Sequence, residues 1–363
     1  MDILFVAVAL LVLSLLVLVH ELGHFIVAKF SGVWVEEFGV GLPPRVFGKK
    51  IGETVYSVNA LPFGGFVRLH GESTDVGASK PERAFYGKSK KARIAVALAG
   101  VVMNLVFAVA AFATINFFVG VPRETGEVKI IDVAESSPAE QSGLTSGGII
   151  EKVDGQEIVR AVEFVDAVSA VAGPEVALVV DGEEFIVEVR ETPPPGEGAI
   201  GVVISSRDQY FPPLWQRPFL FLFEGIRQTW GMAAFMLAGF AAIFSEVGRG
   251  GAPQGLAGPV GITALLVEVA RLGAIPLLEM AAFISINLAL LNLIPFPPLD
   301  GSRVVLVTSE LLLGKKKRAK VEGILNTGGM AILITLLVLL TIREVPALLS
   351  AGSISAFVDT LLQ

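Results

Sequence analysis

Long apolar runs set the pattern of this chain, and they predict helices that cross a bilayer. A membrane-spanning helix needs about 20 predominantly apolar residues. The segments that reach about this length are residues 3–30, 94–120, 275–294 and 324–342. A shorter apolar run, residues 231–244, follows the charged Arg217, Glu224 and Arg227. We interpret it as an interfacial or amphipathic helix, with a fifth span as the alternative.

Residues 121–206 differ from the rest, because apolar and polar residues alternate there and turn pairs such as Asp154-Gly155 and Asp181-Gly182 interrupt them. This pattern predicts short strands joined by turns. We expect strands at 128–133, 149–153, 176–180, 185–189 and 200–205, and a helix at 162–171. The chain therefore contains an inserted α+β domain between its second and third spans.

Composition supports a membrane protein and removes several kinds of chemistry. The 363 residues are 53% hydrophobic, and the mean hydropathy is +0.70. A net charge of −7 argues against nucleic acid as a partner. Cysteine is absent, which excludes disulfides, thiolate zinc ligands and thiol catalysis. The first apolar run lacks a preceding basic region and a convincing cleavage site, so we expect a retained helix.

Basic residues gather in two of the predicted loops. The first loop contains Lys49, Lys50, Lys88, Lys90, Lys91 and Arg93, and the second contains the KKKR run at 315–318. By the positive-inside rule, both loops are cytoplasmic. Both termini and the domain at 121–206 then lie outside the cytoplasm.

The sequence HELGH, residues 20–24, lies within the first predicted span. Ionisable groups at membrane depth are costly and usually functional. On a helix, His20 and His24 lie one turn apart on one face and can bind one Zn²⁺, with Glu21 beside it as a general base. A pair of histidines can also join helices by hydrogen bonds, but that role does not account for Glu21. We interpret the remaining histidine, His70, as a solvent-facing loop residue.

A third ligand is needed, because a catalytic zinc ion usually has three protein ligands and a water. Asp300 is the best candidate, since it follows an apolar span and the prolines at 295, 297 and 298. Prolines cannot continue a helix, and unwound backbone at membrane depth normally lines a cavity. Under the charge-based topology, His20 and Asp300 both lie near the cytoplasmic ends of their spans. This set predicts peptide hydrolysis, with Glu21 passing a proton from a zinc-activated water to the leaving amine.

Residues 39–67 combine spaced apolar residues with Gly and Pro, which is typical of short hairpins. Open sheet edges occur at membrane depth only where they lie against protein or a polar cavity. We therefore expect a β-rich loop that dips towards the active site.

These motifs resemble those of the site-2 protease family of intramembrane zinc metalloproteases. The matches are HELGH at 20–24, NLIPFPPLDG at 292–301, SVNALPFGGFV at 57–67, AGVVMN at 99–104 and GPVGI at 258–262. The resemblance covers nearly the whole chain and favours the bacterial, PDZ-containing branch. It implies that His20, His24 and Asp300 bind the metal, that Glu21 is the base, and that Asn292 helps to hold the substrate or the oxyanion.

The resemblance also implies where a substrate binds. The stretch that ends at Gly64-Gly65 is similar to the family's membrane-reentrant β-loop, which pairs with an extended substrate strand. Edge pairing holds a peptide bond open for attack, whereas a helix hides it. The residues expected to contact substrate in the membrane are Asn59, Pro62, Gly64, Gly65 and Pro295.

The domain at 121–206 resembles a PDZ domain. Ile200, Gly201 and Val202 would form its carboxylate-binding loop and strand, and the helix at 162–171 would form the other wall of the groove. Relatives that act on anti-sigma factors often carry two such domains, whereas this chain has room for one. The groove can bind a peptide or act as a size filter, and the residues leave both open.

We therefore predict a polytopic α-helical membrane protein with about four transmembrane helices, a β-rich membrane-reentrant loop and one inserted α+β PDZ domain. Its predicted parts are a membrane core at 1–120, an extracytoplasmic PDZ domain at 121–206, an amphipathic region at 207–274 and a second membrane core at 275–363.

Such a protein would lie in the inner (plasma) membrane and cleave transmembrane segments near the cytoplasmic side. Its substrates would be membrane proteins such as anti-sigma factors or remnant signal peptides, already cut by a site-1 protease. The alternatives are a catalytically inactive PDZ adaptor and a membrane-anchored zinc peptidase that acts on soluble peptides.

Overall fold

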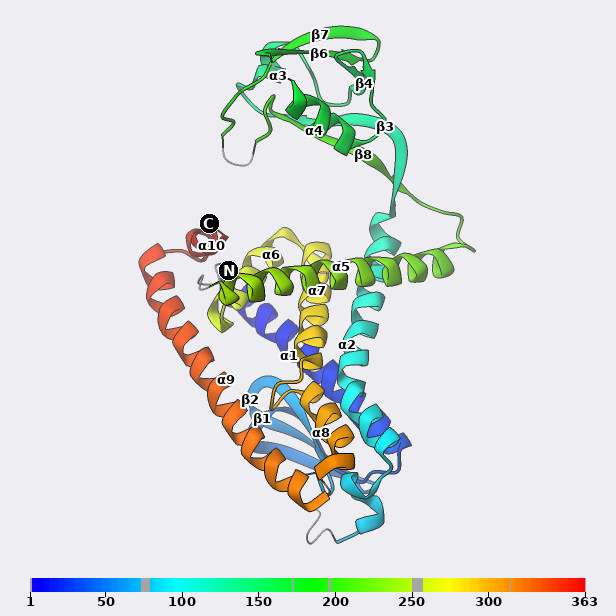
Figure 1. Ribbon diagram of the computed structural model, residues 1–363, viewed down its shortest axis with the longest axis vertical. Coiled ribbons are helices and arrows are strands. Elements are labelled where there is room, and N and C mark those ends of the chain that lie inside the picture. Colours follow the sequence, from blue (N-terminus) through cyan, green and yellow to red (C-terminus); the bar gives the residue numbers. More distant parts are fainter. Residues whose placement is uncertain are drawn as a thin grey trace. The chain divides into compact units, whose positions relative to one another are not determined.

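The computed structural model describes residues 2–72, 79–171, 173–194, 197–249, 257–313 and 315–362. The chain divides into two compact units, which are described separately (Figure 1). The helical unit comprises Met1–Asn116 and Pro218–Gln363, and the inserted unit comprises Phe117–Arg217.

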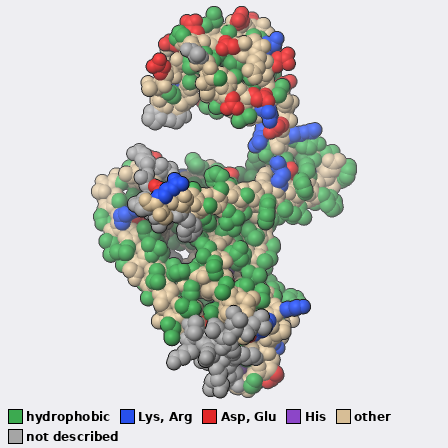
Figure 2. Space-filling view, in the orientation of Figure 1, with side chains coloured by type: hydrophobic (Ala, Val, Ile, Leu, Met, Phe, Trp, Pro, Cys, Tyr) green, Lys and Arg blue, Asp and Glu red, His purple; other side chains and the backbone are tan. Residues whose placement is uncertain are grey.

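Four long apolar helices dominate the helical unit, at the predicted places. They are α1 (Asp2–Phe30), α2 (Lys90–Val119), α7 (Ala274–Leu293) and α9 (Lys315–Ala351). Within the described residues, four segments are long and apolar enough to cross a membrane, namely Ile3–Phe30, Lys90–Val119, Ala274–Leu293 and Glu322–Ala351. Hydrophobic side chains cover much of the visible face of this unit, whereas the inserted unit displays many acidic side chains (Figure 2). The chain is thus built as a multi-pass membrane protein with a polar insertion.

Helix α5 (Arg217–Gly248) runs across α2 and α7 in Figure 1. It is longer than the predicted run at 231–244. Its Gly225 lets it approach α2 closely, because a Cβ there would lie 2.7 Å from the carbonyl oxygen of Val109. Large apolar side chains remain exposed along its length, among them Phe219, Phe223, Trp230 and Phe235. An amphipathic helix of this kind suits a membrane surface.

The β-rich loop is a twisted hairpin of β1 (Val35–Ile51) and β2 (Thr54–Leu69). The two strands are irregular, because Phe38 pairs with both Tyr56 and Val67. The start of β1 therefore lies between the two ends of β2, and the end of β1 continues the sheet beyond Tyr56. This arrangement leaves the last residues of β2 at one margin of the sheet.

This margin packs against α1 through small residues. A Cβ on Gly64 would lie 3.1 Å from the side chain of Val17, and one on Gly65 would lie 3.2 Å from the side chain of Leu18. Gly64 also has a φ of +67°, which favours glycine. The hydroxyl of Ser14 on α1 donates to the carbonyl oxygen of Pro62 at 2.7 Å. These contacts fix β2 beside the helix that carries the HELGH motif.

The turn between β1 and β2 is held by charge. Glu53 accepts two hydrogen bonds from the Arg83 guanidinium, at 2.5 and 2.7 Å. These bonds, together with Lys29, lower the pKa of the Glu53 carboxyl to about 2. Arg83 belongs to η1 (Pro81–Arg83), which with η2 (Phe85–Gly87) leads into α2.

Three shorter helices complete the helical unit: α6 (Pro259–Leu272), α8 (Asp300–Leu313) and α10 (Ile354–Leu362). The start of α6 is anchored by Glu344 of α9, whose side chain is 1% exposed. Its carboxylate accepts hydrogen bonds from the backbone N–H groups of Gly258, Val260 and Gly261. A carboxylate at a helix N-terminus satisfies otherwise unpaired donors, so this contact ties α9 to α6.

The inserted unit is a sheet whose described strand pairs are all antiparallel, with one main helix. Its elements are β3 (Val121–Val133), α3 (Pro138–Gln141), β4 (Ile149–Val153), β5 (Gln156–Glu157), α4 (Ala161–Ala170), β6 (Glu175–Val180), β7 (Glu183–Glu188) and β8 (Val202–Tyr210). The strand order is β7-β6-β4-β3-β8, with β5 paired to β4. Strand β8 is therefore at an edge of the sheet.

The strand bounds in this unit differ from the sequence prediction, since β3 begins at Val121 and β8 extends to Tyr210. Strand β8 begins at Val202 and not at residue 200, because Gly201 has a φ of +79° and Ile200 is buried in the core. Helix α4 turns Phe164 and Val168 to that core, while Val162 and Val165 stay exposed.

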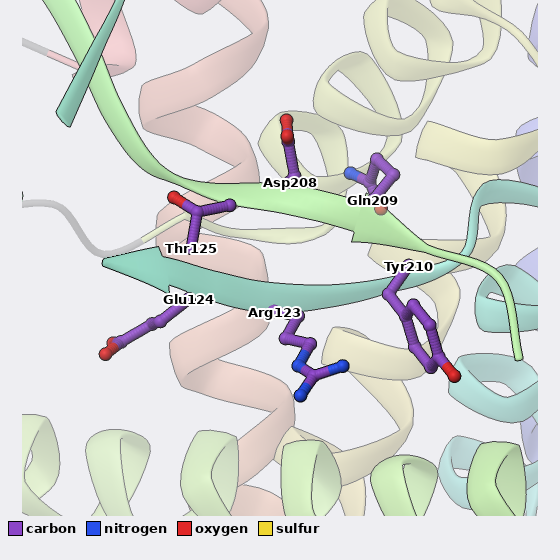
Figure 3. A pocket seen from close by; sticks show the side chains of 6 residues that line it. All are labelled: Arg123, Glu124, Thr125, Asp208, Gln209 and Tyr210. Atoms are coloured by element: carbon purple, nitrogen blue, oxygen red, sulfur yellow. The ribbon is translucent and has the colours of Figure 1, made fainter. Parts of the chain in front are cut away.

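The first residues of β3 pair with the last residues of β8 as a two-stranded ribbon (Figure 3). Its side chains enclose a shallow cavity of about 370 Å³, lined by Arg123, Glu124, Thr125, Asp208, Gln209 and Tyr210. The Arg123 guanidinium lies 5.2 Å from the centre of the Tyr210 ring. Because Val121 pairs with Tyr210, the chain enters and leaves the inserted unit at adjacent points.

The core of the inserted unit gives a stability prediction. Leu178 on β6 is fully buried, so Leu178→Ala should destabilise this unit by about 2–5 kcal/mol through lost burial and a cavity. Ile186 on the neighbouring β7 is 63% exposed, so Ile186→Ala should change stability by at most about 0.5 kcal/mol. Amide hydrogen exchange of β4 and β6 in the full-length protein in detergent measures both. Equal effects of the two substitutions would contradict the observed core.

Candidate metal centre

Helix α1 places two histidines on one buried face. His20 and His24 are 9% and 5% exposed, and their Nε2 atoms lie 3.1 Å apart. The helical spacing of four residues causes this, since such residues are neighbours on one face. The neighbouring Gly23 allows α2 to approach, because a Cβ there would lie 2.3 Å from the carbonyl oxygen of Ala99.

Asp300 reaches the two histidines from the far end of the chain. Its Oδ2 lies 3.0 Å from His20 Nε2 and 3.1 Å from His24 Nε2. Helix α7 ends at Leu293 and α8 begins at Asp300, so the proline-containing link between them is unwound as the sequence predicts. Gly301 lets α8 start against the end of α7, because a Cβ there would lie 2.3 Å from the carbonyl oxygen of Leu293.

The chemistry of these three atoms fits a divalent cation. The Nδ1 of His24 lies 2.7 Å from the carbonyl oxygen of Val96, so Nδ1 donates there and Nε2 presents a lone pair. That lone pair faces the carboxylate oxygen of Asp300, and buried acceptors that face one another need a cation between them. Ligands of a tetrahedral zinc ion with bonds of about 2.0–2.1 Å lie about 3.3–3.4 Å apart, close to the separations here.

The three residues form the one cluster of potential metal ligands found among the described histidines and acids. Two imidazoles and one carboxylate are a usual donor set for catalytic zinc, in which a fourth position stays open. The Asp300 carboxylate would offset part of the charge of a bound cation, and each imidazole would supply one neutral nitrogen ligand.

A cavity of about 260 Å³ opens at this cluster. Its lining combines the side chains of the cluster with residues from α1, β2, α7, α8 and the links that follow β2 and α7, namely His20, Glu21, His24, Phe66, Val67, Leu69, Glu72, Asn292, Pro298, Leu299, Asp300 and Arg303. The predicted Asn292 thus lies in the same cavity as Glu21. The Oε2 of Glu21 accepts the backbone N–H of Val67 at 3.0 Å, which holds the end of β2 beside the carboxylate.

Two charged lining residues were not predicted from the sequence. Arg303 and Glu72 form an ion pair of 2.6 Å at the edge of the cavity. Arg303 follows Asp300 by one helical turn, and this spacing could have identified it. Glu72 comes from a loop after β2, and its position depends on the folded hairpin.

His70 is not a solvent-facing loop residue, so that prediction was wrong. Its side chain is buried, its Nδ1 lies 2.7 Å from Glu36 Oε1, and its ring packs on Trp34. The cause is the fold of the hairpin, which brings β1 next to the residue that follows β2. His70 is not part of the metal cluster.

The other predicted contact residues lie in three places. Pro62, Gly64 and Gly65 lie along β2 against α1, as described above. Asn59 is buried, and its amide donates to the carbonyl oxygens of Val40 and Gly41 at 3.2 Å, so it stabilises the hairpin. Pro295 is exposed in the unwound link after α7. Ile200, Gly201 and Val202 belong to the inserted unit.

Comparisons with known proteins agree with this centre. The profile of peptidase family M50 matches residues 8–336. A Clostridium perfringens protein named as a zinc metalloprotease is 35% identical over 346 residues, covering 94% of this chain and 98% of that protein. The zinc metalloprotease RasP of Oceanobacillus iheyensis is 26% identical over 420 residues, covering 93% and 98%. The chloroplastic membrane metalloprotease ARASP of Arabidopsis thaliana is 32% identical over 341 residues, covering 90% and 75%.

Long apolar helices and a His–His–Asp cluster that could hold a metal ion agree with the similarity to zinc-dependent membrane metalloproteases. The chain belongs to peptidase family M50, the site-2 protease family. It is a metalloendopeptidase with zinc as its cofactor, so the inactive-adaptor alternative is set aside.

The cluster gives a prediction on metal binding. His20→Ala, His24→Ala and Asp300→Ala should each weaken zinc binding by more than about 100-fold, because removing a ligand costs more than removing an outer partner. His70→Ala is the matched control and should leave zinc affinity unchanged. Chelator competition with elemental analysis of the purified protein measures this. Full zinc affinity in Asp300→Ala would place the third ligand elsewhere.

Proposed function

We propose that this metalloprotease hydrolyses peptide bonds within transmembrane segments of other membrane proteins. The observation that carries the proposal is the position of His20 and His24, two of the three residues of the cluster, on a helix long and apolar enough to span a membrane. A zinc peptidase that acts on soluble peptides needs no such placement. Membership of a family of membrane proteases also supports membrane proteins as substrates and a lipid environment for the enzyme.

The side chains suggest a division of roles. His20, His24 and Asp300 hold the metal, and zinc supplies a Lewis acid and a water whose pKa is lowered to about 7 in well-studied hydrolases. Glu21 lies in the same cavity without belonging to the cluster, so its carboxylate can receive a proton from that water and return it to the leaving amine. The amide of Asn292 can donate a hydrogen bond to the substrate carbonyl or the developing oxyanion.

The margin of β2 is the proposed site of substrate pairing. Gly64 and Gly65 keep this part of β2 against α1, and Val67 is bonded to Glu21. A substrate strand added to this margin would pass close to the catalytic carboxylate. Pairing would also satisfy the backbone groups of a substrate that has unwound from its helix.

The distribution of basic residues supports an orientation with both termini and the inserted unit outside the cytoplasm, in the inner (plasma) membrane. The metal centre would then lie towards the cytoplasmic side. Helix α5, with its exposed aromatic residues, would lie in the interface on the opposite side.

The inserted unit is proposed to be a PDZ domain that controls entry of substrates. Its β8 is an edge strand beside α4, and the exposed Val162 and Val165 of α4 would form one wall of a groove. Ile200, Gly201 and Val202 lead into β8 at the end where a carboxylate would bind. Cleavage would follow a first cut by a site-1 protease, which removes a bulky outer domain.

The general-base role predicts a separation of metal binding from catalysis. Glu21→Gln should keep zinc and lose about 10²–10⁴-fold in kcat, because the amide cannot take up the proton. The measurement is cleavage of a model transmembrane substrate in detergent, with zinc content determined on the same preparation. Glu268→Gln on α6, away from the cavity, is the control and should cleave normally. Activity of Glu21→Gln above a few percent would refute the assignment.

The gating role predicts a change in selectivity. Since Val121 pairs with Tyr210, residues 122–209 can be replaced by a short Gly/Ser linker without stretching the chain. The shortened enzyme should cleave a truncated model substrate at an unchanged rate. It should also cleave a substrate with a bulky outer domain, which the intact enzyme rejects. A shortened enzyme that folds and binds zinc but cleaves neither substrate would exclude a pure gating role.

A further inference from the structure

One face of α2 forms the wall behind both metal-binding histidines. Val96, Gly100 and Asn104 follow one another at intervals of four residues, so they lie in one stripe along the helix. Val96 offers its carbonyl oxygen to His24 Nδ1 at 2.7 Å. Asn104 places its side-chain amide 3.4 Å from His20 Nδ1. Each imidazole therefore meets α2 through the ring nitrogen that points away from Asp300.

Gly100 occupies the middle of this stripe and explains how the rings fit. A Cβ at this position would lie 2.4 Å from His20 Cε1 and 2.5 Å from His24 Nε2. Both separations are far below van der Waals contact. The backbone of α2 can therefore support the two rings only where there is no side chain.

The position of the Asn104 amide next to His20 determines which hydrogen bond the two side chains can form. The residue is fully buried, and no described donor reaches its Oδ1. For His20 Nε2 to give its lone pair to a cation, the hydrogen of the neutral ring must be on Nδ1, so Nδ1 needs an acceptor. The nitrogen and oxygen of a side-chain amide are nearly equal in size, so a half-turn exchanges their positions at little cost. This half-turn brings Oδ1 of Asn104 to the Nδ1–H of His20, so that both the oxygen and the N–H have a hydrogen-bond partner.

We propose that Asn104 is a positioning residue that accepts a hydrogen bond from His20 Nδ1–H and so fixes the ring with Nε2 towards the metal. Val96 does the same for His24 through its backbone. Asn104 is itself held in place, because Ser285 of α7 donates to its backbone oxygen at 2.9 Å. The stripe acts through the ligands and does not touch the substrate. This inference rests on the proposed ligand roles of the histidines.

The hydrogen bond should be visible as metal affinity. Outer partners of metal-bound histidines typically contribute 10–100-fold, so Asn104→Leu, which fills the space without an acceptor, should weaken zinc binding by about 10–100-fold. Asn104→Asp keeps an acceptor and should stay within about threefold of the wild type. Asn116→Leu is the matched control, because Asn116 is equally buried on α2 but pairs with Gln228. It should bind zinc normally.

The experiment uses the full-length protein in detergent. Zinc affinity is measured by chelator competition, and the visible spectrum of the Co²⁺-loaded protein reports the ligand field. His20→Ala is included as a benchmark for loss of a ligand. If His20→Ala binds zinc normally, His20 is not a ligand. That result would overturn the proposed ligand set, and with it the positioning role of Asn104. If His20→Ala loses zinc while Asn104→Leu keeps full affinity and an unchanged spectrum, the positioning role is overturned.

Two further results separate positioning from packing. Equal weakening by Asn104→Asp and Asn104→Leu would show that only shape matters at this position, and it would overturn the hydrogen-bonding role. Should Asn104→Leu fail to fold, as judged by melting in excess chelator, Asn104→Ala replaces it with the same expected loss. Gly100→Ala should also lower zinc affinity by displacing the rings, whereas Gly231→Ala on α5, where nothing lies within 4 Å, should not.

Discussion

Three buried acceptor atoms that face one another at 3.0–3.1 Å are the constraint on which the rest of the structure depends. Without a cation they would oppose one another in a medium that solvates charge poorly. A cation held by these atoms would join α1 to α8, which are far apart in sequence. It would then contribute to the packing of the helical unit as well as to the chemistry.

The surroundings of the cluster serve to bring and keep these atoms together. The unwound link after α7 turns Asp300 inward, Gly301 permits the tight start of α8, and the glycines on both sides of the α1–α2 contact let the helices approach. Elsewhere, a bidentate pair of Arg93 and Glu310, both almost fully buried, joins α2 to α8. Polar contacts in this unit are few but well placed, as expected where lipid replaces water around the protein.

The sequence was sufficient for the long helices, the His–His–Asp grouping and the β-rich loop, because each depends on a local pattern with a clear physical meaning. Asp300 could be predicted because an acid that follows prolines at the end of an apolar run is costly unless it binds a cation. The burial of His70 could not, since its partners Glu36 and Trp34 are brought to it only by the pairing of β1 with β2. The spacing of Val96, Gly100 and Asn104 on α2 can be read from the sequence. Their contact with the two histidines could not be predicted, because it depends on which face of α2 packs against α1. The choice of Phe164 over Val165 as a core residue of α4 likewise depended on tertiary packing.

The hydrogen bond between Glu21 and the amide of Val67 has a consequence for how a scissile bond is chosen. It ties the Glu21 carboxylate, the proposed general base, to one residue of a strand, and strands alternate the direction of their peptide groups with a period of two. A chain laid along this margin could therefore present every second peptide group to the metal in the correct sense, and a slip by one residue would turn the carbonyl away. The scissile bond would then be selected by the register in which the substrate strand pairs with β2. The side chains of the substrate would only decide between the permitted registers.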